Sequence, residues 1–280
     1  MTTTDKYAVF GNPIKHSKSP QIHTAFARQT NQDIIYRKHK VEIGKFADAA
    51  RSFFDNGGRG LNITVPFKLD AFEFADELSE RAQRAGAVNT LARMDDGSIF
   101  GENTDGAGLI RDICDNLDWE ITGRRVLLLG AGGAVRGILE PLIRKEPRHL
   151  LIANRTVKKA QKLAADFSDL GDVRACRFEA LTSNQFDLVI NGTAASMSGE
   201  LPPLPSDILS DTGCCYDMVY SAEPTPFMRW GASNAAWAVS DGLGMLVEQA
   251  AESFYLWRGV YPKTQPVIDM IRGEMESEAR

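Results

Sequence analysis

Short apolar runs alternate with segments of helical periodicity along the whole chain. Apolar side chains within residues 46–53 have the i, i+3, i+4, i+7 spacing of a helix, and Ser19-Pro20 supplies an N-cap and a first-turn proline for another. In the first part of the chain we predict strands at 7–10, 34–41 and 61–65, helices from 19 to about 30, from 46 to 57 and from 67 to about 84, and a hairpin of 87–93 with 98–101. Strands joined by crossover helices predict a mainly parallel sheet that is covered on both faces.

The alternation resumes after a predicted helix at residues 106–117. Strands are expected at 125–129, 149–153, 173–178, 186–190, 214–219 and 236–239, and helices at 135–142, from 157 onward, at 244–258 and after Pro266. A chain of 280 residues fits two domains of ~150 residues each. We therefore predict a two-domain α/β fold, in which 1–105 form the first domain and 106–242 a second, Rossmann-like domain. The helices within about 243–280 are expected to pack back on the first domain.

Composition and charge exclude several classes of partner. The chain has 32 basic and 37 acidic residues, a net charge of −5, which argues against a nucleic acid or an anionic membrane. The first residues lack the apolar core of a signal peptide, and no run approaches the ~20 apolar residues that span a bilayer. The four cysteines have no C-x-x-C spacing, so we expect buried, reduced thiols and a cytoplasmic protein.

A glycine-rich segment follows the predicted strand at 125–129. Its residues are Gly130, Ala131, Gly132, Gly133 and Ala134. Glycines let backbone N–H groups approach a pyrophosphate, and a helix N-terminus favours its charge. The third glycine of the G-x-G-x-x-G fingerprint is replaced by Val135, and such a turn also arises from tight packing alone. The residues after the next strand therefore distinguish a pyrophosphate site from a turn that is only tightly packed.

The residues after the strand at 149–153 indicate NADP rather than NAD. An NAD site has an acidic residue here to bind the ribose 2′-hydroxyl. This chain has no carboxylate at that place and instead has Asn154, Arg155, Thr156, Val157, Lys158 and Lys159. The Arg155 guanidinium suits a 2′-phosphate and an adenine ring, and Thr156 adds a hydroxyl. The alternative is a basic helix start exposed to solvent.

Polar residues also gather where strands of the first domain are expected to end. Thr64 and Lys68 lie at one strand end, Asn89 at another, and Asp105 at the start of the helix at 106–117. Ligands collect at the carboxyl ends of strands in α/β sheets. We interpret Asp105 as the carboxylate that holds the Lys68 ammonium, and the set as a site for a small polyhydroxylated substrate. A solvated lysine and a helix-capping aspartate are the structural alternatives.

Ser17 and Ser19 begin the first helix, where backbone donors favour an anion, although capping alone explains Ser19. The four histidines (His16, His23, His39 and His149) match no metal or triad spacing, and no metal is expected.

Taken together, these segments resemble the shikimate dehydrogenase family over essentially the full chain. The resemblance rests on motifs in a shared order, namely Gly11-Asn12-Pro13 with Ser17-Lys18-Ser19-Pro20, Asn62-Ile63-Thr64-Val65-Pro66-Phe67-Lys68, Gly86-Ala87-Val88-Asn89-Thr90, Asn103-Thr104-Asp105-Gly106, Gly130-Ala131-Gly132-Gly133-Ala134, Asn154-Arg155-Thr156, Tyr216-Asp217-Met218-Val219-Tyr220 and Gly242-Leu243-Gly244-Met245-Leu246. One departure is Asn191-Gly192-Thr193-Ala194-Ala195, where the family commonly has Asn-Ala/Thr-Thr/Ser.

The resemblance implies reduction of 3-dehydroshikimate to shikimate with NADPH, a step toward aromatic amino acids. It assigns Lys68 and Asp105 to catalysis. It also implies that the substrate carboxylate meets Ser17, Ser19 and Tyr220, and that the ring oxygens meet Thr64, Lys68, Asn89, Asp105 and Gln249. The cofactor would be lined by Gly130 to Ala134, Asn154 to Lys159, Met218 and Gly242, with Glu80 as a neighbour. Tyr220 is the alternative to Lys68 as proton donor.

Two rival functions are open at this stage. One is a quinate/shikimate dehydrogenase that uses NAD(P), and the other is a non-catalytic NADP sensor on the same fold. Oligomeric state is left open between a monomer and a homodimer.

Overall fold

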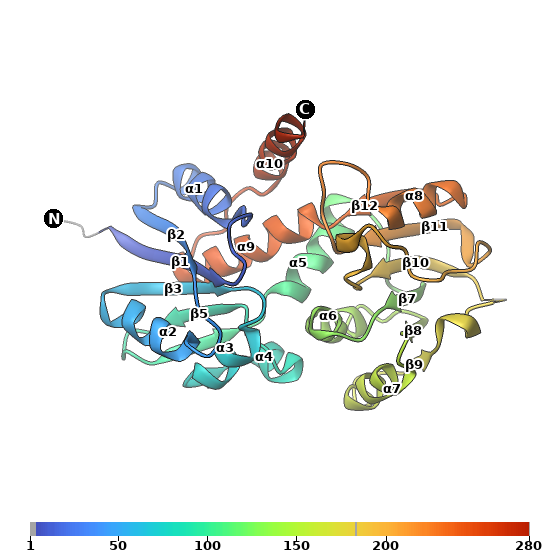
Figure 1. Ribbon diagram of the computed structural model, residues 1–280, viewed down its shortest axis with the longest axis horizontal. Coiled ribbons are helices and arrows are strands. Elements are labelled where there is room, and N and C mark those ends of the chain that lie inside the picture. The colour runs from blue at the N-terminus through green and yellow to red at the C-terminus, as the bar shows by residue number, and fades with distance from the viewer. Residues whose placement is uncertain (1–3, 183, 280) are drawn as a thin grey trace. The chain divides into compact units, whose positions relative to one another are not determined.

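The computed structural model describes residues 4–182 and 184–279. The chain divides into two compact units. Unit 1 consists of Met1–Gly108 and Val247–Gly273, and unit 2 of Leu109–Leu246 and Glu274–Arg280. Each unit contains one six-stranded sheet with helices packed on it (Figure 1).

The sheet of unit 1 has the strand order β2-β1-β3-β5-β6-β4. Its strands are β1 (Asp5–Gly11), β2 (Ile34–Lys40), β3 (Gly58–Ile63), β4 (Glu77–Leu78), β5 (Thr90–Arg93) and β6 (Ile99–Glu102). The pairings of β1 with β2, β1 with β3 and β4 with β6 are parallel. The predicted hairpin is present as β5 and β6, and β5 is also antiparallel to β3. The sheet is therefore mixed, with its parallel part at β1, β2 and β3.

Helices cover both faces of this sheet. They are α1 (Ser19–Thr30), α2 (Phe46–Asp55), α3 (Lys68–Phe74), α4 (Glu80–Ala85) and, from the end of the chain, α9 (Leu243–Arg258). The last helix, α10 (Gln265–Glu278), has most of its residues in unit 1. Side chains alternate along β1, so Ala8 and Phe10 pack into one apolar cluster with α2 and α3. Tyr7 and Val9 pack into another cluster on the opposite face, with Trp257 of α9. The Tyr7 and Trp257 rings stack with their centroids 4.7 Å apart.

Two of the differences between unit 1 and the prediction have a local cause. The helix expected at 67–84 is broken into α3, β4 and α4, because Ser79 accepts a hydrogen bond from the Ala82 N–H and caps a new helix. Asp76 also accepts a hydrogen bond from the Ile99 N–H, which holds the break against β6. At α1, Lys18 is the N-cap residue and Ser19 is the first helical residue, so Ser19 was wrongly predicted to be the cap.

The sheet of unit 2 is parallel throughout, with the order β12-β11-β10-β7-β8-β9. Its strands are β7 (Arg125–Leu129), β8 (His149–Ala153), β9 (Val173–Cys176), β10 (Phe186–Asn191), β11 (Leu209–Asp217) and β12 (Ala238–Asp241). The helices are α5 (Asp105–Arg111), which begins in unit 1, α6 (Gly133–Ile143), α7 (Val157–Asp166) and α8 (Pro226–Ser233), with single 3₁₀ turns at Phe178–Ala180 and Ala195–Ser198. This strand order is that of a doubly wound nucleotide-binding fold.

Both faces of the second sheet are buried. Val126 and Leu128 of β7 pack with α6 and α7, whereas Leu127 and Leu129 pack on the other face with Phe227 of α8. Burial on both faces explains why these strands appear in the sequence as continuous apolar runs.

The helix predicted at 106–117 changes its winding partway. α5 is followed by a π-helical turn at Asp112–Asn116. The carboxylate of Asp112 is buried there and accepts a hydrogen bond of 2.5 Å from the Tyr216 hydroxyl. This bond ties the turn to β11.

The four cysteines are free thiols. Within the described residues, no helix is long and apolar enough to cross a membrane, and no cluster of three metal-binding side chains occurs.

Candidate active site

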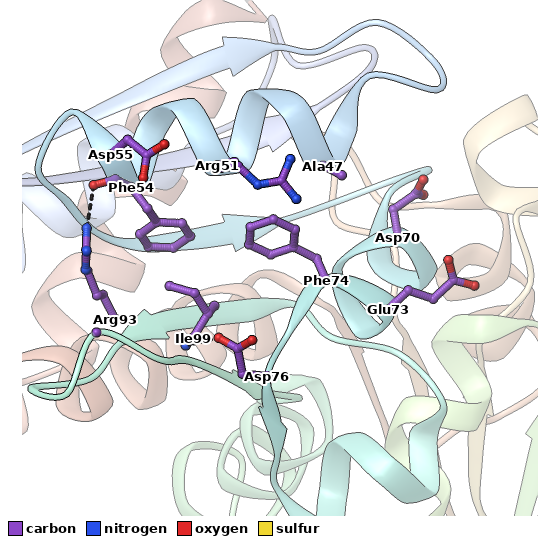
Figure 2. Close-up of a pocket in the computed structure, with 11 residues that line it drawn as sticks. Ala47, Arg51, Phe54, Asp55, Asp70, Glu73, Phe74, Asp76, Arg93 and Ile99 are labelled. Atoms are coloured by element: carbon purple, nitrogen blue, oxygen red, sulfur yellow. Dashed lines mark hydrogen bonds between the residues drawn. The ribbon is translucent and has the colours of Figure 1, made fainter.

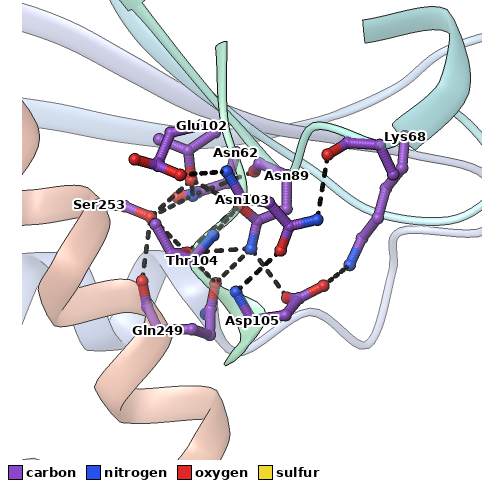
Figure 3. Close-up of polar contacts among 11 residues, drawn as sticks. Asn62, Lys68, Asn89, Glu102, Asn103, Thr104, Asp105, Gln249 and Ser253 are labelled. Atoms are coloured by element: carbon purple, nitrogen blue, oxygen red, sulfur yellow. Dashed lines mark hydrogen bonds and ion pairs between the residues drawn. The ribbon is translucent and has the colours of Figure 1, made fainter. Parts of the chain in front are cut away.

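The centre of the candidate site in unit 1 is an ion pair between Lys68 and Asp105 (Figure 3). Lys68 is the first residue of α3, where its charge opposes the helix dipole, and Asp105 is the first residue of α5, where the dipole favours a carboxylate. The Lys68 Nζ donates a hydrogen bond to Asp105 Oδ2. The side chains are 28% and 12% exposed, so the pair is shielded but accessible to a small molecule.

Asn89 holds the other oxygen of the Asp105 carboxylate. Its Nδ2 donates to Asp105 Oδ1 at 2.8 Å, and its Oδ1 accepts from the Thr104 backbone N–H at 2.9 Å. Gln249 of α9 reaches the same place, because its Oε1 lies 3.3 Å from Asn89 Nδ2. The structure thus brings together four residues that were predicted from the sequence: Lys68, Asn89, Asp105 and Gln249.

Three further polar residues belong to this network and had no predicted role. Asn62 at the end of β3, Thr90 at the start of β5 and Ser253 of α9 are all buried. Asn62 Nδ2 donates to Ser253 Oγ at 2.9 Å, and the Ser253 and Thr90 hydroxyls are 2.7 Å apart. Asn62 and Thr90 lie inside motifs that we recognised. Ser253 is a serine in the middle of a helix, and its only signal is its position one turn after Gln249.

The two serines and Thr64 have their own local contacts. Ser17 Oγ donates to Ser19 Oγ at 3.2 Å, and the Ser19 N–H lies 3.3 Å from Ser17 Oγ. The Thr64 N–H donates to the Phe10 carbonyl at 2.9 Å, which fixes the chain between β3 and α3. In the described part of the chain, these three residues make no hydrogen bond to the Lys68–Asp105 pair.

The glycine turn of unit 2 joins β7 to α6. Gly130 has a φ of +104°, a conformation that favours glycine, and Gly132 is the N-cap of α6. Val135 is fully buried at the place of the missing third glycine. A Cβ on Gly192 would lie 2.4 Å from Val135 Cγ2, so the glycine at 192 makes room for the valine at 135. The two departures from the expected motifs therefore compensate for each other.

The structure leaves the predicted 2′-phosphate residues open at the start of α7. Thr156 is the N-cap residue, but its side chain makes no capping bond. Arg155, Thr156, Lys158 and Lys159 are exposed, while Asn154 and Val157 are half-buried. Among the described residues, the Arg155 guanidinium has no carboxylate partner. Three exposed cations beside a helix N-terminus fit a phosphate, and the adjoining turn fits the pyrophosphate of a dinucleotide.

A second loop of unit 2 contains Met218 and Tyr220. Asp217 is buried and accepts hydrogen bonds from Asn191, Ser196, Thr225 and the Val219 N–H. Burial raises the pKa of Asp217, although these bonds act to lower it. Burial, and then the charge of Asp241, raise the pKa of the Tyr220 hydroxyl above its usual value near 10. This shift makes the Tyr220 hydroxyl a weaker acid than an ordinary tyrosine.

Gly242 and Glu80 complete the predicted cofactor residues. A Cβ on Gly242 would lie 2.4 Å from the Met218 carbonyl oxygen, so only glycine allows this approach. Glu80 is in the first turn of α4 and belongs to unit 1, unlike the other predicted cofactor residues.

An open pocket elsewhere in unit 1 is lined by α2, α3 and the strands β5 and β6 (Figure 2). Phe54, Phe74 and Ile99 form its apolar part, and four carboxylates and two guanidinium groups surround them. None of the predicted site residues is among those that line it. It is therefore separate from the network around Asp105.

Comparison with known proteins places these motifs in one family. The models described as Shikimate dehydrogenase substrate binding domain, Shikimate / quinate 5-dehydrogenase and Shikimate 5'-dehydrogenase C-terminal domain match residues 9–91, 112–198 and 242–270. A protein of Methylococcus capsulatus named Shikimate dehydrogenase (NADP(+)) is 58% identical over 274 residues, which cover 98% of each chain. A protein of the same name from Cellvibrio japonicus is 57% identical over 275 residues, covering 98% of this chain and 99% of that one.

Solved structures agree with the sequence matches. The Ael1 enzyme from Pseudomonas putida has a TM-score of 0.91 and 49% identity, covering 95% of this chain and 97% of that one. Shikimate 5-dehydrogenase from Thermus thermophilus, in complex with NADP(H) and shikimate, has a TM-score of 0.85 and 29% identity, covering 95% of this chain and 97% of that one. With more than half of its residues identical to these curated relatives over nearly its whole length, the chain belongs to the shikimate dehydrogenase family.

Proposed function

We propose that this protein is an NADP-dependent shikimate dehydrogenase, which reduces 3-dehydroshikimate to shikimate. The single observation that carries this proposal is the shielded Lys68–Asp105 pair, surrounded by amides and hydroxyls. A ring that bears several hydroxyls needs such partners once water is excluded. The two relatives named Shikimate dehydrogenase (NADP(+)) also match this chain over 98% of its length.

Lys68 acts on the ketone oxygen. When bound, NADPH supplies a hydride to the ketone carbon. The Lys68 ammonium stabilises the negative charge that develops on the oxygen and donates the proton that completes the hydroxyl. Asp105 keeps the ammonium in place, and Asn89 in turn fixes Asp105. In the oxidative direction, neutral Lys68 takes the hydroxyl proton. Tyr220 is the weaker candidate for the proton donor, because burial raises its pKa.

The remaining residues bind and orient. Ser17, Ser19 and Tyr220 hold the substrate carboxylate, and Thr64, Asn89 and Gln249 hold ring oxygens. Arg155 and Thr156, supported by Lys158 and Lys159, hold the 2′-phosphate, and Gly130 to Ala134 hold the pyrophosphate. Asn154, Val157, Met218 and Gly242 line the cofactor, with Glu80 at its edge.

The division of labour between domains is part of the same proposal. Residues 1–105 with 243–280 form the substrate domain, and 106–242 form the NADP domain. We also propose that the protein is cytoplasmic, because free thiols fit a reducing compartment. Its proposed oligomeric state is a monomer or a homodimer.

The test is a spectrophotometric assay of NADPH oxidation with 3-dehydroshikimate, run on the wild type and on Lys68→Ala. We expect a large fall in kcat with a modest change in KM, as when a transition-state interaction is lost. Turnover close to normal in the variant would remove Lys68 from the chemistry and promote Tyr220. Reduction of 3-dehydroshikimate with NADH, and oxidation of quinate with NADP⁺ or NAD⁺, would indicate the broader quinate/shikimate activity. Tight binding of NADPH without its oxidation by 3-dehydroshikimate or any other keto acid would indicate a sensor.

A further inference from the structure

A buried tyrosine stands at the far end of the hydrogen-bond network from Lys68. Tyr36 of β2 is 8% exposed, and its hydroxyl donates to Asn62 Oδ1 at 2.7 Å. Its ring is stacked against His23, with centroids 4.3 Å apart and planes 7° from parallel. Burial raises the pKa of Tyr36 well above 10, an effect larger than that of the Ser19 hydrogen bond that lowers it. The phenol therefore keeps its proton.

This proton fixes the orientation of the Asn62 amide. Because Asn62 Oδ1 accepts from Tyr36, the amide nitrogen points the other way. Asn62 Nδ2 donates to Ser253 Oγ at 2.9 Å and to Thr90 Oγ1 at 3.2 Å. Both protons of the amide are then used on hydroxyl oxygens.

The hydroxyls of Thr90 and Ser253 continue this direction of hydrogen-bond donation. Each has one proton, so a hydroxyl that accepts from Asn62 is free to donate elsewhere. Thr90 Oγ1 donates to Asn89 Oδ1 at 3.0 Å, so it is the acceptor in its 2.7 Å hydrogen bond with the Ser253 hydroxyl. If Asn62 were reversed, its carbonyl would attract these protons, and Asn89 would lose the donation from Thr90.

Asn89 receives this donation on the oxygen side of its amide. Its Oδ1 accepts from Thr90 and from the Thr104 N–H, and its Nδ2 therefore faces Asp105 Oδ1. Hydrogen bonds in a chain polarise one another, so donation to the Asn89 oxygen strengthens the bond from its nitrogen. The chain from Tyr36 to Asp105 runs in one direction throughout.

We propose that Tyr36 is a positioning residue for the Lys68–Asp105 pair. Its phenolic proton sets the direction of the relay Tyr36–Asn62–Thr90–Asn89, which holds Asp105 against Lys68. Tyr36 reaches the pair through these residues, and its other hydrogen bond is with Ser19, so it is a positioning residue and not a catalytic residue. This inference rests on the proposed function for its kinetic consequence, but the relay itself exists without substrate.

The kinetic test compares Tyr36→Phe with Tyr7→Phe. Tyr7 is the register neighbour of Tyr36 on β1 and is also buried, but its hydroxyl contacts Arg258 at 3.3 Å, outside the relay. We expect kcat to fall about threefold to tenfold in Tyr36→Phe, the range that one net buried hydrogen bond supplies. Tyr7→Phe should stay within about twofold of the wild type, the span of an ordinary small effect.

A double-mutant cycle identifies the route. Thr90→Val removes the hydroxyl that links Asn62 to Asn89 and keeps the branched shape. If the relay passes through Thr90, adding Tyr36→Phe to Thr90→Val should cost almost nothing more in kcat. If the fall in kcat in the double variant is instead the product of the two single effects, the relay is contradicted.

A spectroscopic measurement separates failure of the relay from failure of the proposed function. In the unliganded protein, the side-chain amide resonances of Asn89 should shift and exchange faster with solvent in Tyr36→Phe and in Thr90→Val, and remain unchanged in Tyr7→Phe. Absence of turnover in the wild type would overturn the function and leave this readout intact. If Tyr36→Phe does not fold, Thr90→Val carries the same test. Unchanged Asn89 resonances in a folded relay variant, together with normal kcat where turnover exists, would overturn the proposal.

Discussion

Replacing Asp105 by asparagine is the sharpest test of how the site holds Lys68. The substitution keeps the shape of the side chain and removes its charge. The wild-type carboxylate accepts from Lys68 on one oxygen and from Asn89 Nδ2 on the other, at 2.8 Å. An asparagine has a single oxygen, so its NH₂ group would face either the Lys68 ammonium or the Asn89 amide, and donor would meet donor.

The expected loss follows from these contacts. A hydrogen bond to a charged group contributes about 1.5–3 kcal/mol, and the Asp105 side chain is only 12% exposed, so water does not replace it fully. If the bond is needed to place the ammonium at the ketone oxygen, kcat falls about 10- to 100-fold. The assay is the initial rate of NADPH oxidation at saturating 3-dehydroshikimate.

The matched control is Asp187→Asn in unit 2. Asp187 also forms a shielded ion pair, with Arg125 at 2.7 Å, but lies outside the predicted site. We expect its kcat to match that of the wild type. A kcat for Asp105→Asn within about twofold of the control would refute the idea that the carboxylate positions Lys68.

Three further outcomes are expected. Arg155→Ala should lower kcat/KM for NADPH by about 10- to 100-fold, the value of a lost charge-assisted contact, and leave the NADH value unchanged; an equal fall with both cofactors would exclude a role at the 2′-phosphate. The Arg125 hydrogen bond holds the pKa of Asp187 well below its usual range, so the pair stabilises the fold above pH ~4 and this stability is lost as the pH falls toward the folded-state pKa. The Tm difference between wild type and Asp187→Asn should therefore be largest near neutral pH and shrink in acid, and a constant difference would contradict this. Gly192→Ala should lower the Tm because its Cβ would meet Val135, and Val135→Ala should restore part of the loss, which is checked by thermal unfolding of the single and double variants.

The sequence predicted local structure best where both faces of an element are buried. The strands β7 and β8 begin and end at the predicted residues, because their continuous apolar runs have one simple explanation. The prediction of one helix at 67–84 was wrong because Ser79 caps a new helix inside a segment whose apolar spacing looked continuous. A capping serine and a polar surface serine look alike until the chain is folded.

Long-range contacts set the limit for the site. Residues at strand ends were expected to meet, and the structure brings Lys68, Asn89 and Asp105 into contact; their roles remain a prediction. Tyr36 and Ser253 could not be linked to them in this way. The Tyr36–Asn62 bond spans 26 residues and the Asn62–Ser253 bond spans 191, and neither separation has a local pattern.

Unit 1 is built from two stretches of chain that are made at different times. During synthesis its first 108 residues leave the ribosome long before residues 247–273, which follow most of unit 2. Until α9 arrives, the face of the sheet that contains Tyr7 has no Trp257 to stack on it, and Asn62 has no Ser253 to receive its proton. Unit 1 therefore lacks the α9 part of its packing until residues 247–273 are made, whereas most of unit 2 is complete before then. Premature termination before α9 therefore produces a chain in which the Tyr7 face of the first sheet lacks its α9 contacts, and chaperones and proteases recognise such exposed apolar surface.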